Sequence, residues 1–124
     1  MTRLDALLQP RAGAAESGHP ECVLLVENSR VFAEMLATAV RERLGLAVDV
    51  AGSLAEARQR LDPARHFLVL TGLVLPDASG DEIVPPLARS GVPTVVVTSM
   101  LDDETRQRLV RMPIIDYVPK TAPD

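Results

Sequence analysis

Polar residues that can do chemistry follow several short apolar runs of this 124-residue sequence. Glu27 and Asn28 come after CVLLV, Thr98 ends TVVVT, and Lys120 closely follows IIDYV. A carboxylate can bind a hard cation, whereas a lysine beside backbone amides can hold an anion. The plainer alternatives are a lone carboxylate at a strand end and a solvated surface lysine. These groups can act together only if the fold brings the ends of the runs to one place.

Five apolar segments are predicted to be strands. CVLLVE and FLVLT are continuous runs rich in Val and Leu, the pattern of a strand buried on both faces of a parallel sheet. In such a sheet, ligands gather at the carboxyl ends of the strands, where the polar residues stand. The predicted strands cover residues 22–27, 46–51, 67–71, 94–99 and 114–118.

The segment after the first strand has a helical repeat. Ser29 is its predicted N-cap, and Gly45 is placed to end it. The apolar residues between them are expected on one buried stripe of the helix. They are Val31, Phe32, Met35, Leu36, Ala39, Val40 and Leu44.

Three further helices are expected. The S-x-x-E capping box at 53–56 opens a helix that ends at about residue 61. Residues 72–80 are predicted to form a loop. The helix expected at 81–89 contains Pro85-Pro86, which removes two amide donors and should leave it short or broken. The last helix is capped by Asp102 or Asp103 and runs to about residue 111.

The predicted order of elements is βαβαβαβαβ. Regular alternation favours an α/β fold with three layers, a five-stranded parallel sheet with helices on both faces in the flavodoxin-like order. Residues 21–124 are assigned to this domain. Residues 1–20, with many Pro, Gly, Ala and polar residues, are expected to form a flexible leader.

Composition argues against several classes of function. Aromatic residues make up 2% of the chain and the net charge is -4, so nucleic-acid binding is not expected. No apolar run reaches the ~18 residues of a membrane helix, and no secretion signal is found, which favours a cytoplasmic protein without membrane contact. The single cysteine, Cys22, excludes an internal disulfide and a cysteine-based zinc cage. The histidines, His19 and His66, form no cluster with metal-ligand spacing, so no metal or cofactor is expected.

Four fragments occur in an order and spacing that indicate a family: VLLVENSRVF, LTGLVLPDASG, VVVTS and DYVPK. Across residues 22–120 the sequence resembles the receiver domains of two-component response regulators. In that family an aspartate accepts a phosphoryl group, and an acidic pair holds Mg²⁺. A Thr or Ser and a Lys bind the phosphoryl oxygens.

The resemblance implies a phosphorylation pocket formed by Glu27, Asn28, Gly72, Thr98 and Lys120. Glu27, Thr98 and Lys120 match the residue types of the family. Asn28 replaces the second acid, or else is a turn or cap residue, and Gly72 stands at the phosphoacceptor position. Because glycine has no nucleophile and Asn28 offers only a neutral oxygen, the pocket is predicted to be vestigial. With no aspartate to share, Lys120 is expected to pair with Glu27.

Two further features follow from the resemblance. Tyr117 matches the aromatic switch residue of receivers, with Thr98 as its partner, and the alternative is a core or edge ring. Arg106, Arg108 and Arg111 lie on the helix that receivers commonly use to contact partners. The alternative for these arginines is a solvated helix face.

We therefore expect a pseudo-receiver, a non-enzymatic module of phosphorelay signalling that binds another protein or further domains of its own chain. ENSRVF and DDETRQRLVRMPIIDYVPK are most similar to the first receiver of double-receiver diguanylate cyclases. One alternative is a phosphorylatable receiver with an unusual acceptor, for which Asp77 is the candidate, although Pro76-Asp77 has the pattern of a turn. The other is a sensor that holds a small anion between Gly72, Thr98 and Lys120.

A receiver ends in a fifth helix, for which the four residues after Lys120 are too few. The fifth helix is therefore expected to be absent or truncated, with apolar side chains exposed on the sheet near the first and fifth strands. Three things can cover such a face: the leader residues Leu4, Leu7 and Leu8, a second copy of the chain, or a following helix. Self-association as a homodimer is the outcome we expect.

Overall fold

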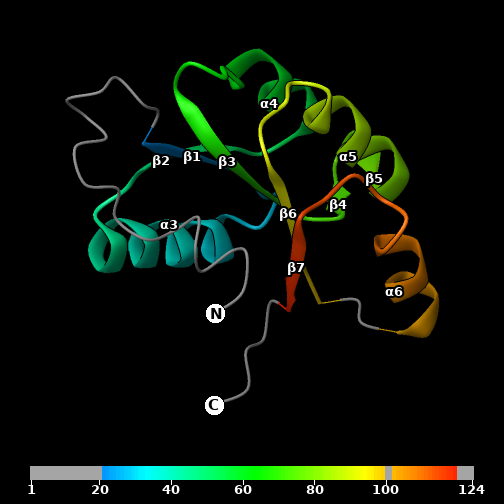
Figure 1. Ribbon diagram of the computed structural model, residues 1–124. Coiled ribbons are helices and arrows are strands. Elements are labelled where there is room, and N and C mark those ends of the chain that lie inside the picture. Colours follow the sequence, from blue (N-terminus) through cyan, green and yellow to red (C-terminus); the bar gives the residue numbers. More distant parts are fainter. Residues whose placement is uncertain (1–20, 100–101, 120–124) are drawn as a thin grey trace.

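The computed structural model describes residues 21–99 and 102–119 (Figure 1). The strands of its main sheet are β1 (Cys22–Val26), β2 (Ala47–Ala51), β3 (His66–Thr71), β6 (Thr94–Thr98) and β7 (Asp116–Pro119). The helices are α3 (Arg30–Leu44), α4 (Leu54–Arg60), α5 (Gly80–Ala88) and α6 (Asp103–Leu109). A small hairpin is formed by β4 (Val74–Leu75) and β5 (Ala78–Ser79).

The main sheet is parallel, with strand order β2-β1-β3-β6-β7. This order confirms the predicted flavodoxin-like fold. Val26 lies opposite both Ala51 and Thr71, and Thr98 lies opposite Pro119. The register therefore brings the carboxyl ends of the strands to one edge, as the polar residues after them require.

Helices cover both faces of the sheet, because successive strand residues point to opposite sides. Val23 and Leu25 pack in one cluster with the α3 residues Ala33 and Ala37. On the other face, a second cluster contains Leu24, Val26, Ala57, Ile83 and Leu87, so α4 and α5 pack there. Figure 1 shows α3 on one side of the sheet and α4 and α5 on the other.

The caps of α3 agree with the sequence. Ser29 Oγ accepts a hydrogen bond from the Phe32 amide at 3.3 Å. Gly45 adopts a left-handed φ of 67°, which glycine tolerates without strain, and its amide donates to the Arg41 carbonyl. Both ends of the helix are therefore fixed by local sequence.

The predicted buried face of α3 is wrong for two residues. Val31 is 79% exposed and Met35 is 60% exposed. The helix instead turns Ala33, Ala37 and Val40 to the sheet, a set that repeats at helical spacing. Val31 and Met35 lie on the side of the helix that faces away from the sheet. The seven apolar residues predicted to form one stripe are too widely spread around the helix to be buried together.

The stretch predicted as a loop at 72–80 contains the β4–β5 hairpin, which turns at Pro76-Asp77. The following helix α5 runs without a break through Pro85 and Pro86. The two missing donors would have bonded to the carbonyls of Asp81 and Glu82. Both residues are exposed, so water can satisfy those carbonyls. The expectation of a short or broken helix is met in its first form, because α5 has nine residues and is not interrupted.

The last helix and strand are shifted from their predicted bounds. Asp102 is the N-cap of α6 and accepts from the Thr105 amide at 2.7 Å, but the helix ends at Leu109. Strand β7 begins at Asp116, two residues later than predicted. The amide of Ile115 already bonds to the Thr94 carbonyl at 2.9 Å, so the chain joins the sheet edge before the strand begins.

The expected exposed sheet face is not found at its central positions. Val23, Leu25, Val95 and Val97 have exposed fractions of 0%, 2%, 0% and 6%. The reason given for self-association therefore fails at these residues. The leader, with Leu4, Leu7 and Leu8, and the residues after Pro119 lie outside the described part of the chain. Within that part, no helix has the length and apolar character needed to cross a membrane.

Candidate functional site

Glu27 lies at the carboxyl edge of the sheet, directly after β1. Its amide donates to the Ala51 carbonyl at 2.9 Å, which extends the β1–β2 pairing by one residue. Its side chain is 5% exposed, and Oε2 accepts a hydrogen bond from the Ser29 amide at 2.7 Å. The carboxyl group is thus buried and held in place beside the start of α3.

Gly72 lies next to Glu27, directly after β3. Its amide donates to the Val26 carbonyl at 2.9 Å. A β-carbon built on Gly72 would lie 3.1 Å from Glu27 Oε1, a contact tighter than ordinary van der Waals packing. A β-carbon at position 72 would therefore require the Glu27 carboxyl group to shift by a few tenths of an ångström.

The other predicted pocket residues have different placements. Thr98 is 2% exposed at the end of β6, so it is buried at the same edge of the sheet. Asn28 is exposed and, together with Glu27, lines the end of an open groove of about 680 Å³ between α3, β2 and α4. Lys120 lies outside the described residues, so its predicted contact with Glu27 stays a prediction.

The groove carries side chains of both charges. Its walls include Arg30, Glu34 and Arg41 from α3 and Glu56 from α4. Arg41 donates to the Val48 carbonyl at 2.8 Å, which places its guanidinium against the edge strand β2. Because side chains of both charges line the groove, its charge favours neither an anion nor a cation.

Tyr117 is half-buried on β7, opposite Val96. Its ring packs against an apolar cluster that includes Leu73, Val84 and Leu109. This placement agrees with a ring at the margin of the core. The switch role with Thr98 stays a prediction.

The three arginines of the predicted partner surface are exposed. Arg108 contacts Asp81 at 3.0 Å, and a β-carbon on Gly80 would lie 3.1 Å from its Nη2. Arg108 thus lies across the start of α5 and connects it to α6. No ion pair is recorded for Arg106 or Arg111 within the described ranges, so these two are the more accessible part of the surface.

Asp77 has a contact that the sequence did not predict. From the hairpin turn, its two carboxylate oxygens accept from the amides of Leu54 and Ala55 at 2.8 and 2.9 Å. These bonds hold the pKa of Asp77 below its ordinary value. Asp77 therefore caps the start of α4, next to the local cap Ser53.

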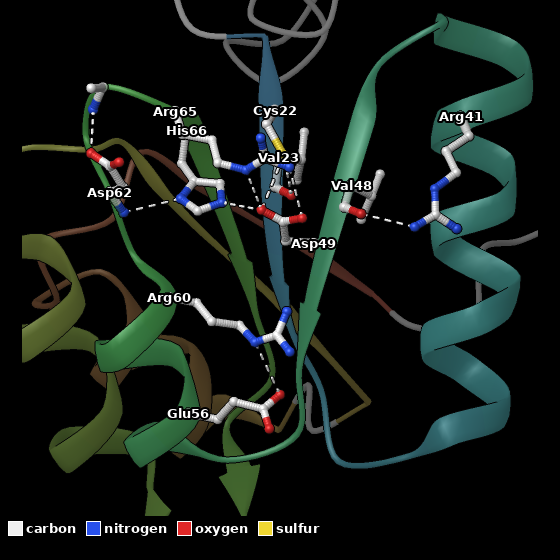
Figure 2. A network of polar contacts seen from close by, with 11 residues as sticks. Cys22, Val23, Arg41, Val48, Asp49, Glu56, Arg60, Asp62, Arg65 and His66 are labelled. Atoms are coloured by element: carbon white, nitrogen blue, oxygen red, sulfur yellow. Dashed lines mark hydrogen bonds and ion pairs between the residues drawn. The ribbon is translucent and has the colours of Figure 1, made fainter.

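A polar cluster at the opposite end of the sheet was also missed. Asp49 lies at its centre, and its carboxylate is in hydrogen-bond contact with the side chains of Cys22, His66 and Arg65 (Figure 2). The Arg65 bond is the main cause that lowers the pKa of Asp49, and burial together with Asp49 raises the pKa of the Cys22 thiol. Sequence spacing gave no sign of this cluster, because Cys22 and His66 come together only where β1 pairs with β3. Strand pairing was the signal that could have located it.

Comparisons with known proteins agree with the geometry. The profile of the response regulator receiver domain family matches residues 23–124. The chain is 34% identical over 104 residues to the transcriptional regulatory protein DpiA of Escherichia coli, covering 82% of this chain and 46% of that protein. It therefore spans about half the length of this curated relative.

Solved structures show the same fold. The non-phosphorylated HemR receiver domain of Leptospira biflexa is 26% identical, with a TM-score of 0.67 and 84% of each chain covered. A putative two-component system response regulator/GGDEF domain protein is 30% identical, with a TM-score of 0.74 over 82% of this chain and 41% of that one. The chain belongs to the receiver domain family of two-component response regulators.

Proposed function

We propose that this chain is a pseudo-receiver, a regulatory module that does not accept a phosphoryl group and acts by binding protein surfaces. The observation that carries the proposal is that Gly72 stands at the carboxyl edge of the sheet, beside the buried carboxyl group of Glu27. The position where the family has its acceptor aspartate has no side chain here, and the neighbouring carboxyl group lies close to where a β-carbon would stand.

Metal binding is weakened for a related reason. Phosphoryl transfer in receivers requires Mg²⁺, which is held mainly by charged carboxylate oxygens. Here Asn28 supplies only a neutral oxygen and position 72 supplies none. Glu27 is the remaining carboxylate of the set, and its Oε2 already accepts from Ser29. A single carboxylate is a poor site for a cation that dehydrates reluctantly.

The alternative acceptor Asp77 has little support. Both of its oxygens accept backbone amides at the start of α4, so the carboxylate is committed to a structural contact. Phosphorylation would add a phosphoryl group to one of these oxygens and disturb its hydrogen bond to α4. The small-anion sensor has little support as well, because the carboxyl group of Glu27 lies beside Gly72, where its charge would repel an anion.

A binding role is supported by exposed apolar side chains on α3. Val31 and Met35 are four residues apart and therefore neighbours on the outer side of the helix, and both are largely exposed. Exposed apolar side chains that lie together indicate a contact surface more than scattered ones do. The proposal includes further domains of a longer regulator as binding partners, since the matched relative is about twice the length of the match.

The test is phosphorylation with a small phosphodonor. The chain is incubated with acetyl phosphate and Mg²⁺, and its intact mass is measured. We expect no added phosphoryl group, whereas the matched Gly72→Asp/Asn28→Asp variant supplies an acceptor and a second acid for comparison. A stable phosphoryl adduct on the unmodified chain, mapped to any carboxylate, would overturn the proposal.

A further inference from the structure

The cluster around Asp49 combines a thiol, an imidazole and a carboxylate from three adjacent strands. Cys22 lies opposite His66 in the β1–β3 pairing, and Leu24 lies opposite Asp49 in the β1–β2 pairing. Cys22 and His66 are 4% and 1% exposed. The Sγ of Cys22, Nε2 of His66 and a carboxylate oxygen of Asp49 all lie within 4.8 Å of one another.

We propose that Cys22, Asp49 and His66 form a binding site for a thiophilic divalent cation of the Zn²⁺ type. A tetrahedral zinc ion has bonds of about 2.3 Å to sulfur and about 2.0 Å to nitrogen and oxygen, so its ligand atoms lie about 3.3–3.6 Å apart. Cys22 Sγ already lies 3.5 Å from Asp49 Oδ2. His66 Nε2 lies 2.8 Å from the same oxygen and would move outward by about half an ångström.

The donor set selects the class of cation. Thiolate and imidazole are preferred ligands of zinc and similar transition metals, whereas Mg²⁺ and Ca²⁺ prefer oxygen alone. Three protein ligands leave a fourth position for water. The site is distinct from the phosphorylation pocket, since Cys22 and His66 begin their strands and Glu27 and Gly72 follow the other ends. The inference therefore does not rest on the proposed function.

Arg65 competes with a cation for this site. Its Nε donates to Asp49 Oδ2 at 2.6 Å, and Nη2 donates to Oδ1 at 3.0 Å. A cation on Oδ2 displaces the Nε contact and can leave the Nη2 contact in place. The Arg65 side chain is 55% exposed, so its guanidinium has room to turn toward solvent. Arg65 thus weakens binding, and its removal is expected to strengthen it.

The ring of His66 sets a second condition. Its Nδ1 accepts from the Asp62 amide at 3.1 Å, so the ring proton lies on Nε2 and points to Asp49. For Nε2 to bind a cation, its proton must leave, and Nδ1 takes up a proton so that the ring stays neutral. Nδ1 can then no longer accept from the Asp62 amide, which donates to water instead. Asp62 lies in an exposed turn, which permits this change. The Cys22 thiol releases its proton to solvent, so each bound cation releases one proton in total.

The test uses the 124-residue chain after treatment with a chelator. Zn²⁺ is added while thermal unfolding is followed, and Co²⁺ is added while thiolate-to-cobalt absorption is followed. We expect a rise in Tm and a thiolate absorption band that saturates at one equivalent. Cys22→Ser and His66→Gln should lose both signals. His19→Gln, outside the described residues, is the matched control and should keep them.

Arg65→Gln keeps all three ligands and tests the competition directly. We expect it to bind Zn²⁺ on the order of tenfold more tightly, because the positive charge that competes for Asp49 Oδ2 is removed. This variant decides the matter if Cys22→Ser or His66→Gln fails to fold. The proposal is overturned if the unmodified chain and Arg65→Gln show neither signal, or if the signals survive in folded Cys22→Ser and His66→Gln. The cluster is then a hydrogen-bonded network only.

Discussion

Glu27 Oε1 lies 3.1 Å from the point where a β-carbon of Gly72 would stand, a contact tighter than ordinary packing. A side chain at position 72 therefore requires the Glu27 carboxyl group to give way by a few tenths of an ångström. The other carboxyl oxygen of Glu27, Oε2, is held by the Ser29 amide at 2.7 Å. An aspartate introduced at position 72 should therefore change the stability of the chain through both packing and charge, and this change can be measured.

Gly72→Asp is expected to lower stability by about 1–2 kcal/mol without divalent cations, because it places two carboxyl groups side by side. Combined with Asn28→Asp, it should create a site whose occupation by millimolar Mg²⁺ raises Tm. Thermal unfolding with and without Mg²⁺ measures both effects. Gly72→Asn is the matched control, with the same crowding but no added charge. If the folded double variant ignores Mg²⁺, the pocket has diverged further than its residues indicate.

Asp77→Ala is expected to destabilise the chain, because two amides at the start of α4 lose their side-chain acceptor. Both amides that it binds are at the start of α4, where Ser53 satisfies only the Glu56 amide. Urea denaturation measures the change in the free energy of unfolding. Asp103→Ala, at an exposed position in the first turn of α6, should have a smaller effect. Equal losses in the two variants would contradict the capping role.

Asp49 is expected to make stability depend on acid pH. The Arg65 bond holds its folded pKa below the unfolded value, so its contribution is present above about pH 4 and is lost as the pH falls toward the folded pKa. Asp49→Asn should cost about 2 kcal/mol at pH 7, discounted for the exposure of Arg65, and much less near pH 2. Denaturation curves from pH 2 to 7 test this. Glu42→Gln, at an exposed position, should leave the pH profile unchanged.

The orientation of α3 is tested by a pair of substitutions. Val31→Ser changes a largely exposed side chain and should alter stability by less than about 0.5 kcal/mol. Ala37→Leu adds volume at a position 2% exposed against the sheet and should cost about 1–3 kcal/mol. Chemical denaturation compares the two. If Val31→Ser lost more stability than Ala37→Leu, the face of α3 assigned to the core would be wrong.

The strands and caps were predictable because their signals are local. A continuous run such as CVLLV indicates a buried strand without knowledge of its neighbours, and Ser29, Gly45 and Asp102 act within a few residues of themselves. The face of α3 was not predictable in the same way. Its sheet-facing positions include two alanines, Ala33 and Ala37, which carry little hydrophobic signal.

The missed contacts are all long-range. Cys22 and His66 are adjacent only because β1 pairs with β3, and Asp77 reaches α4 only because the hairpin turns toward it. The position of Glu27 over Gly72 depends on a missing side chain and a rotamer held by Ser29. Sequence identified both residues as members of one pocket, but only the three-dimensional packing relates their atoms.

The cap that Asp77 provides has a consequence for the order of folding. Helix α4 has seven residues, too few to be stable alone, and two of its first amides bond to a residue 22 and 23 positions later in the chain. The helix can therefore gain this stabilisation only after β3 and the hairpin have formed. Substitutions at Asp77 should mainly speed unfolding and leave the folding rate nearly unchanged, so α4 consolidates on the late side of the transition state.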